Sequence, residues 1–138
     1  MIKNLSNYFE SEQEYYLERL SYEKSNEQNT TSDYSLKCLD NIDIELINEQ
    51  TQLKLTVQRV VNFEPNELFH LMISYGVILK FKEENKSDYD WEKVNLKEEF
   101  KKNGDFALGN IMNRISLLIA EVTASFGQPP IILPPGIL

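Results

Sequence analysis

The most regular pattern of apolar residues lies between Asp105 and Phe126. Eight large apolar side chains recur there at spacings of three and four, which places them on one face of a helix. These are Leu108, Ile111, Met112, Ile115, Leu118, Ile119, Val122 and Phe126. Asp105 is expected to cap the start of this helix and Gly127 its end. The pattern therefore predicts a long amphipathic helix that the rest of the chain covers.

Three earlier segments alternate apolar and polar residues with a period of two, as β-strands do. The segments are 36–46, 53–63 and 69–81. Short polar turns at 48–51 and 64–67 separate them, so neighbouring strands are expected to run antiparallel. The third segment is apolar on one side and mixed on the other, which is typical of a strand inside a sheet.

Two charged residues interrupt the apolar side of the first two strands. Asp40 breaks the first alternation and Arg59 breaks the second. We expect a bulge or bend in the chain near Asp40 and Asn41. The segment 14–24 fits either a helix or a strand, and its tyrosines favour a strand.

These elements predict an α+β fold, in which a four-stranded antiparallel meander packs on one long C-terminal helix that an extended, proline-rich tail follows. We expect a single domain over residues 1–138, with an N-terminal arm at 1–13, a polar crossover at 83–104 and the tail at 127–138. Two Pro-Pro pairs favour an extended path for the tail, and its aliphatic residues predict that it lies along an apolar surface.

The predicted helix carries a second, narrower seam almost opposite its main apolar face. This seam consists of Phe106, Asn113, Leu117, Ala120 and Ala124. One interpretation is that the seam packs against a second subunit, because the small alanines would let another backbone approach. The alternative is that Phe106 and Leu117 are isolated apolar residues on the surface, which are common.

Composition narrows the classes of partner and compartment. A net charge of -8 and a pI of about 4.7 argue against a nucleic-acid partner, which would require a basic surface. A single cysteine excludes an internal disulfide and fits a reducing compartment. The first thirteen residues contain no apolar run typical of a signal peptide, and no stretch is long and apolar enough to span a membrane. We therefore expect a cytoplasmic protein without membrane insertion.

The chain offers little chemistry for catalysis. It has one histidine, His70, and one cysteine, Cys38, and it lacks a glycine-rich phosphate loop or a nucleophile motif. A nucleophilic pair of Cys38 and His70 would require that their strands be neighbours. The preferred interpretation is an inert, buried thiol and a partly exposed histidine. We expect no enzyme activity, no metal and no cofactor.

The end of the chain, NRISLLIAEVTASFGQPPIILPPGI, resembles the C-terminal part of the SecB-type export chaperones. In that family an amphipathic helix ends in a small residue, and an extended segment containing Phe, Pro and Leu follows. The matching residues are Arg114, Ile115, Ser116, Phe126, Gly127, Pro129, Leu133 and Pro135. The resemblance is specific to residues over about 110–136, and the order of strands, crossover and helix extends it to 14–138. Typical members continue beyond this segment into a second helix.

The resemblance implies dimers that pair into tetramers, with the long helices between the sheets. It also implies ATP-independent holding of unfolded polypeptides along hydrophobic grooves, either for delivery to a translocation motor or to guard an antitoxin from degradation. A docking surface for a basic tail of that motor would lie at Asp43 and Glu45; the alternative is a solvated strand face. A second functional hypothesis is an adaptor of the same fold that binds one dedicated partner.

Two aromatic residues, Trp91 and Phe100, flank the expected crossover. One interpretation is that they line an apolar groove together with Ile131, Ile132 and Leu133. Such a groove would hold an extended peptide of loose sequence. The alternative is that Trp91 and Phe100 cap the edge of the core.

Overall fold

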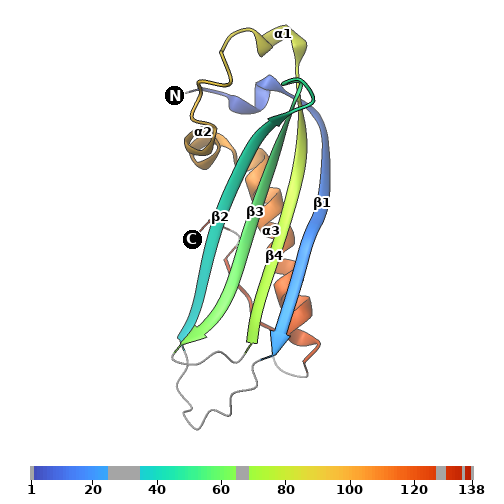
Figure 1. Cartoon of the computed structure of the whole chain (residues 1–138), viewed down its shortest axis with the longest axis vertical. Coiled ribbons are helices and arrows are strands. Elements are labelled where there is room, and N and C mark those ends of the chain that lie inside the picture. The colour runs from blue at the N-terminus through green and yellow to red at the C-terminus, as the bar shows by residue number, and fades with distance from the viewer. Residues whose placement is uncertain (1, 25–34, 65–68, 127–129, 135, 138) are drawn as a thin grey trace.

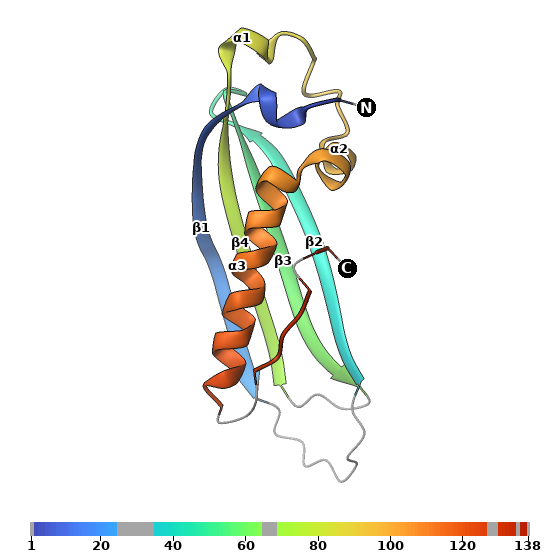
Figure 2. The same cartoon turned by 180° about the vertical axis from the view of Figure 1, so that it is seen from behind.

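The computed structural model describes residues 2–24, 35–64, 69–126, 130–134 and 136–137. The described elements, in chain order, are η1 (Leu5–Tyr8), β1 (Phe9–Lys24), β2 (Ser35–Ile47), β3 (Gln52–Glu64), β4 (Phe69–Phe81), α1 (Glu83–Lys86), α2 (Leu96–Asn103) and α3 (Asp105–Ala124). The four strands form one layer, and α3 lies along one face of it (Figures 1 and 2). Residues 130–134 and 136–137, which we call the extended segment, run beside α3 on the same face (Figure 2). The prediction of a four-stranded antiparallel sheet packed on one long helix is confirmed.

The strand order across the sheet is β1-β4-β3-β2, and all neighbouring strands are antiparallel. The strands β2, β3 and β4 form the predicted meander. β1 pairs with β4 instead of β2, so the prediction that all four strands form a meander is wrong. The composition of β4 fits its place inside the sheet, between β1 and β3, because a strand that is apolar on one side and largely apolar on the other is typical of the sheet interior.

Alternation is clearest in β3, which lies inside the sheet. Four of its apolar residues on the helix side are fully buried, namely Leu53, Leu55, Val57 and Val61, and Phe63 at its end is partly buried. The turn expected at 48–51 is confirmed between β2 and β3. The pairing of these two strands is unbroken from Ser35 opposite Glu64 to Ile47 opposite Gln52, so the expected bulge near Asp40 is wrong. The turn expected at 64–67 lies almost entirely outside the described residues.

The first strand contains the bulge that the sequence did not predict. β1 starts at Phe9, earlier than the expected residue 14. Its register with β4 shifts between Phe9 and Gln13 and again between Leu17 and Arg19, where Glu18 is an extra residue on β1. Before the bulge the odd-numbered residues Tyr15 and Leu17 face the helix side of the sheet. After the bulge the even-numbered residues Leu20 and Tyr22 do so. The segment is a strand, as its tyrosines indicated, and the bulge is the reason why its alternation was ambiguous.

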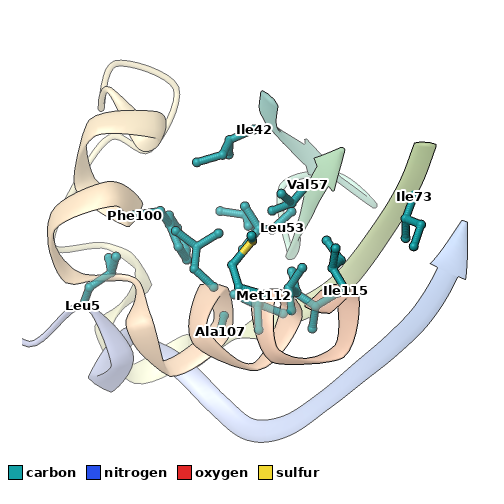
Figure 3. Close-up of a cluster of buried hydrophobic side chains, with 14 of the residues drawn as sticks. Leu5, Ile42, Leu53, Val57, Ile73, Phe100, Ala107, Met112 and Ile115 are labelled. Atoms are coloured by element: carbon teal, nitrogen blue, oxygen red, sulfur yellow. The ribbon is translucent and has the colours of Figure 1, made fainter. Parts of the chain in front are cut away.

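The predicted apolar face of the long helix forms the centre of the core. Ile111, Met112, Ile115 and Ile119 are at most 1% exposed, and Met112 and Ile115 point toward Leu53 and Val57 of β3 (Figure 3). The expectation that Asp105 caps this helix is wrong, because Gly104 is the cap residue and Asp105 already belongs to the first turn. Its carboxylate still lies at the positive end of the helix dipole. At the other end of α3 the cap residue is Ser125 instead of the expected Gly127, which lies outside the described residues.

Candidate functional site

The helix side of the sheet has two different covers. α3 packs on β4 and β3, whereas the extended segment passes over β3 toward β2 (Figure 2). Beneath the extended segment lie the two charged residues that interrupt the alternation of the strands. This region is the candidate site.

Asp40 and Arg59 form a buried ion pair at the floor of this region. They lie directly opposite each other on β2 and β3. Nε and Nη2 of Arg59 each donate a hydrogen bond of 2.7 Å to one carboxylate oxygen of Asp40, and both side chains are 0% exposed. Burial acts to lower the pKa of Arg59, but the hydrogen bonds and the charge of Asp40 together raise it above its ordinary value. The guanidinium is therefore a permanent cation with a fixed orientation.

The remaining donors of this guanidinium bind the extended segment. Nη1 of Arg59 donates to the backbone oxygen of Pro134 at 3.2 Å, and Nη2 donates to the backbone oxygen of Gly136 at 2.7 Å. Both acceptors are carbonyl groups of the main chain, two residues apart. Arg59 thus joins the strand pair β2–β3 to the extended segment through contacts that do not depend on the side chains of that segment.

The other end of the extended segment is attached to α3. The amide of Ile131 donates to Oγ1 of Thr123 at 2.8 Å, while that hydroxyl donates to the backbone oxygen of Ile119 at 2.7 Å. Leu133 is buried and Ile131 is partly buried, whereas Ile132 between them is 74% exposed. This alternation of burial is what an extended chain with one side on the protein would give, and the extended path of the tail as a whole stays a prediction.

The structure places the predicted groove residues in two separate neighbourhoods. Trp91 is 4% exposed, and its ring contacts are with Tyr8, Phe9, Phe81 and Tyr89. Phe100 is fully buried and lines a hollow of about 250 Å³ in which Gly136 and Ile137 of the extended segment also take part. The burial of both aromatic residues fits the alternative that they cap the edge of the core. A groove formed by Trp91, Phe100, Ile131, Ile132 and Leu133 stays a prediction.

The second seam of the helix is divided in a similar way. Phe106 is partly buried, with its ring centroid 6.0 Å from that of Phe9 and 5.9 Å from that of Phe100. Leu117 is 60% exposed, Asn113 and Ala124 are exposed, and Ala120 is half-buried. A subunit interface along this seam stays a prediction. Leu117 is accessible to a second subunit, whereas much of Phe106 is covered within its own subunit.

The acidic side chains Asp43 and Glu45 are both exposed on β2, at the edge of the sheet. Glu45 lies opposite Lys54, whose ammonium is 3.9 Å from a carboxylate oxygen of Glu18. The positions are accessible, and docking of a basic partner there stays a prediction.

The structure does not form the nucleophilic pair that was considered for Cys38 and His70. Their strands, β2 and β4, are separated by β3. Nδ1 of His70 lies 2.7 Å from Oδ1 of Asn62, and burial raises the pKa of the Cys38 thiol. Among the described residues, no group of three or more His, Cys, Asp or Glu side chains could hold a metal ion.

The Asp40–Arg59 pair is the feature that reasoning from sequence missed. Each residue was noted as a break in the alternation of its own strand. Both lie at the same distance from the middle of the 48–51 turn, and in a hairpin such residues face each other. That symmetry was the signal that would have found the pair.

Comparisons with known proteins place this fold. No protein-family model and no curated protein matches the chain. The solved structure of the SecB-like chaperone Rv1957 of Mycobacterium tuberculosis, in complex with a ChAD peptide from the Rv1956 HigA1 antitoxin, superposes with a TM-score of 0.70. The match covers 94% of this chain and 92% of that chain at 8% sequence identity. A protein of unknown function from Streptococcus agalactiae gives a TM-score of 0.39 at 14% identity over 91% of this chain and 98% of that chain, which is too low to compare the two folds. The chain therefore has a SecB-like fold, as the resemblance of its sequence indicated. Among the described helices, none is long and apolar enough to cross a membrane.

Proposed function

We propose that this protein is an ATP-independent chaperone that holds unfolded polypeptides on apolar surface. The observation that carries the proposal is its SecB-like fold, which it shares with a chaperone whose solved structure contains an antitoxin-derived peptide. Holding a polypeptide in this way needs no catalytic group, nucleotide or metal. Export of clients and protection of an antitoxin are the two uses that the proposal includes, in the cytoplasm that the single cysteine fits.

Apolar side chains exposed on both faces of the sheet support this proposal. On the helix side, Leu17 and Leu20 of β1 are 45% and 40% exposed. On the opposite side, Leu39 of β2 is 67% exposed and lies across from Val60, which in turn faces Met72 of β4. Exposed apolar side chains grouped in this way are typical of surfaces that bind other polypeptides.

The proposal also includes assembly into dimers or tetramers through the outer side of α3. Leu117 is the most exposed large apolar residue of that helix. In a lone subunit its side chain would face water. The small residues Ala120 and Ala124 follow it about one and two turns further along the helix. A second copy of the chain would remove this surface from water, and Asp43 and Glu45 would remain accessible at the far edge of the sheet for a basic segment of a partner.

An adaptor that binds one dedicated partner is the second candidate function. The observation that favours it is the single antitoxin-derived peptide in the related structure. An adaptor of this kind would protect its own partner and leave unrelated unfolded proteins unprotected.

Suppression of aggregation by the purified protein tests the proposal. Several unrelated, chemically unfolded proteins are diluted into buffer without nucleotide, and light scattering is followed with and without the chaperone. Suppression for all of them is the expected result, and Cys38→Ala is the matched control because a thiol has no part in the proposed mechanism. Protection of one cognate protein alone would assign the adaptor function. Failure to reduce scattering of any protein would contradict the holding function.

A further inference from the structure

The floor of the candidate site is built to bind main-chain carbonyl groups. Arg59 is fully buried and faces the extended segment with two N–H groups, at 3.2 Å from Pro134 O and 2.7 Å from Gly136 O. In an extended chain, carbonyl groups two residues apart point to the same side. Any extended polypeptide can present such a pair of carbonyl groups, whatever its side chains are.

The pair of Asp40 and Arg59 is already neutral before the extended segment binds. Asp40 accepts from Nε and from one hydrogen of Nη2, and the carbonyl oxygens of Pro134 and Gly136 accept from Nη1 and Nη2. A buried guanidinium whose donors lose their partners is unfavourable, because water cannot replace them fully. The site therefore favours occupation by some carbonyl-bearing chain over exposure of its floor.

The extended segment occupies this site with little else to hold it. Of its described apolar side chains, Leu133 is buried, whereas Ile132 and Ile137 are 74% and 37% exposed. Besides the hydrogen bonds to Arg59, the amide of Ile131 donates to Oγ1 of Thr123. Among the described residues, the attachment thus comprises these three main-chain hydrogen bonds, the buried Leu133 and the partly buried Ile131.

We propose that Arg59, Asp40 and Thr123 form a receptor for an extended, aliphatic and proline-containing polypeptide, and that the extended segment is an internal ligand that a client segment replaces. This inference rests on the proposed holding of clients, and it names the place where one client segment binds. Arg59 binds two carbonyl groups of the client, Thr123 accepts from one of its amides, and an aliphatic side chain takes the pocket of Leu133. A client without regular structure meets these requirements.

Tethering explains how the internal ligand would control access to the receptor. A segment tethered to its own site has an effective concentration of about millimolar. Its release raises the fraction of molecules with an empty receptor, and the apparent affinity for an external peptide rises in proportion to that fraction. Weakening the anchor of the segment should therefore strengthen the binding of a peptide added in solution.

Binding of a synthetic peptide to full-length variants tests this inference. The probe is a fluorescein-labelled peptide with the sequence QPPIILPPGIL, and binding is followed by fluorescence anisotropy. Leu133→Ser removes the buried anchor, and the expected result is peptide binding about tenfold tighter than to the wild type. Ile132→Ser makes the same change at the adjacent exposed position and should bind like the wild type.

A second pair of variants tests the receptor itself. Arg59→Lys in the Leu133→Ser background keeps the charge beside Asp40 but loses the forked donor, and the expected result is peptide binding about tenfold weaker than to Leu133→Ser alone. Thr123→Val in the same background keeps the volume and removes the acceptor hydroxyl, with an expected loss of about threefold. Circular dichroism monitors folding, and Thr123→Val decides the result if Arg59→Lys does not fold.

Three outcomes would overturn the inference. The first is equal peptide binding by the wild type, Leu133→Ser and Ile132→Ser, and the second is no peptide binding by any variant. The third is a smaller assembly of Leu133→Ser without a gain in peptide binding, which would mean that the extended segment binds a receptor on a neighbouring copy. Any of these, combined with normal suppression of aggregation by the wild type, would leave the holding function intact and reject only this site. Tight peptide binding without suppression of aggregation would support the site and reject the holding function.

Discussion

The two halves of the helix side of the sheet are covered by different physical means. Over β4 and the adjacent part of β3, α3 places Ile111, Ile115 and Ile119 against fully buried aliphatic side chains. Over the rest of β3 and β2, the extended segment lies on a buried ion pair and is held by hydrogen bonds to its main chain. The first cover depends on many apolar contacts, and the second depends on a few directed ones.

This difference teaches which cover can be exchanged. Loss of α3 would expose a continuous apolar layer to water, so this helix cannot leave without unfolding of the domain. Loss of the extended segment would expose the small apolar surface that Leu133 and Ile131 cover, together with the donors of one arginine. The helix therefore belongs to the scaffold, while the extended segment belongs to the part of the molecule that can respond to a partner.

The largest effect is expected from a charge in the helix-covered half. Ile115 is 0% exposed, and Ile115→Asp would bury a carboxylate without a partner, at a cost of several kcal/mol. We expect loss of the cooperative thermal transition measured by circular dichroism. Leu117→Asp, two residues away on the exposed side, is the control and should keep a cooperative transition, because its carboxylate is not buried in the subunit. A normal transition for Ile115→Asp would show that this face of α3 is not the core.

Breaking the ion pair should have the next largest effect, in the half covered by the extended segment. Asp40→Asn leaves Arg59 buried without its counter-charge, and we expect the free energy of unfolding to fall by about 3–5 kcal/mol in urea titrations. Replacement of both residues, Asp40→Leu with Arg59→Met, should recover most of that loss because no charge then remains buried. Asp43→Asn, on the exposed side of the same strand, should change the free energy by less than about 0.5 kcal/mol. A large effect of Asp43→Asn would mean that acidic residues of β2 act through the outer surface.

The reactivity of Cys38 on β2 reports how well the half of the sheet beneath the extended segment is shielded from solvent. Burial raises the pKa of this thiol, Arg59 lowers it and Asp40 raises it again, with a net shift above the ordinary value. A raised pKa means that the folded state retains the proton better than the unfolded state does, so this contribution to stability is present below the ordinary pKa and is lost as the pH rises through the folded-state value. We expect the rate of reaction with Ellman's reagent to rise at a higher pH for the native protein than for the protein in urea. A native midpoint at or below that of the unfolded chain would show that the thiol is open to solvent.

The smallest change in stability is expected for Leu117→Glu, on the side of α3 that faces away from the sheet. Leu117 is 60% exposed, so the unfolding midpoint of the subunit should be nearly unchanged. Light scattering should nevertheless give a smaller assembly, because the substitution places a charge in the proposed subunit interface. An unchanged mass would reject this seam as the interface.

Local periodicity predicted the helix-covered half correctly. The spacing of apolar residues in α3 and the alternation in β3 and β4 follow from the geometry of each element by itself. The pairing of β1 with β4 is a contact between segments distant in sequence, and no local pattern encodes it. The resemblance to SecB-type chaperones supplied the fold class, which the structure bears out.

The candidate site was harder to predict because single residues make it. Asp40 and Arg59 each looked like an imperfection of a strand, and their meaning emerged when the register of the hairpin placed them together. The extended segment has no periodicity that would indicate its contacts, since prolines exclude regular hydrogen bonding. Its hydrogen bonds to Arg59 are accepted by backbone oxygens, which every residue has, so the sequence gives no sign of them.

The extra residue Glu18 in β1 shows how this strand could tolerate an insertion or a deletion. Glu18 separates two alternating stretches whose residues face α3 on both sides of the bulge. A deletion at this position would merge the stretches into one regular ladder from Gln13 to Lys24 and leave the pairing with β4 in phase. What it would remove is the carboxylate that accepts from the hydroxyl of Ser74 at 3.1 Å on the outer face. Homologues that differ by one residue here can therefore keep the same sheet. An alignment of them without a gap would assign the residues of half of the strand to the wrong face of the sheet.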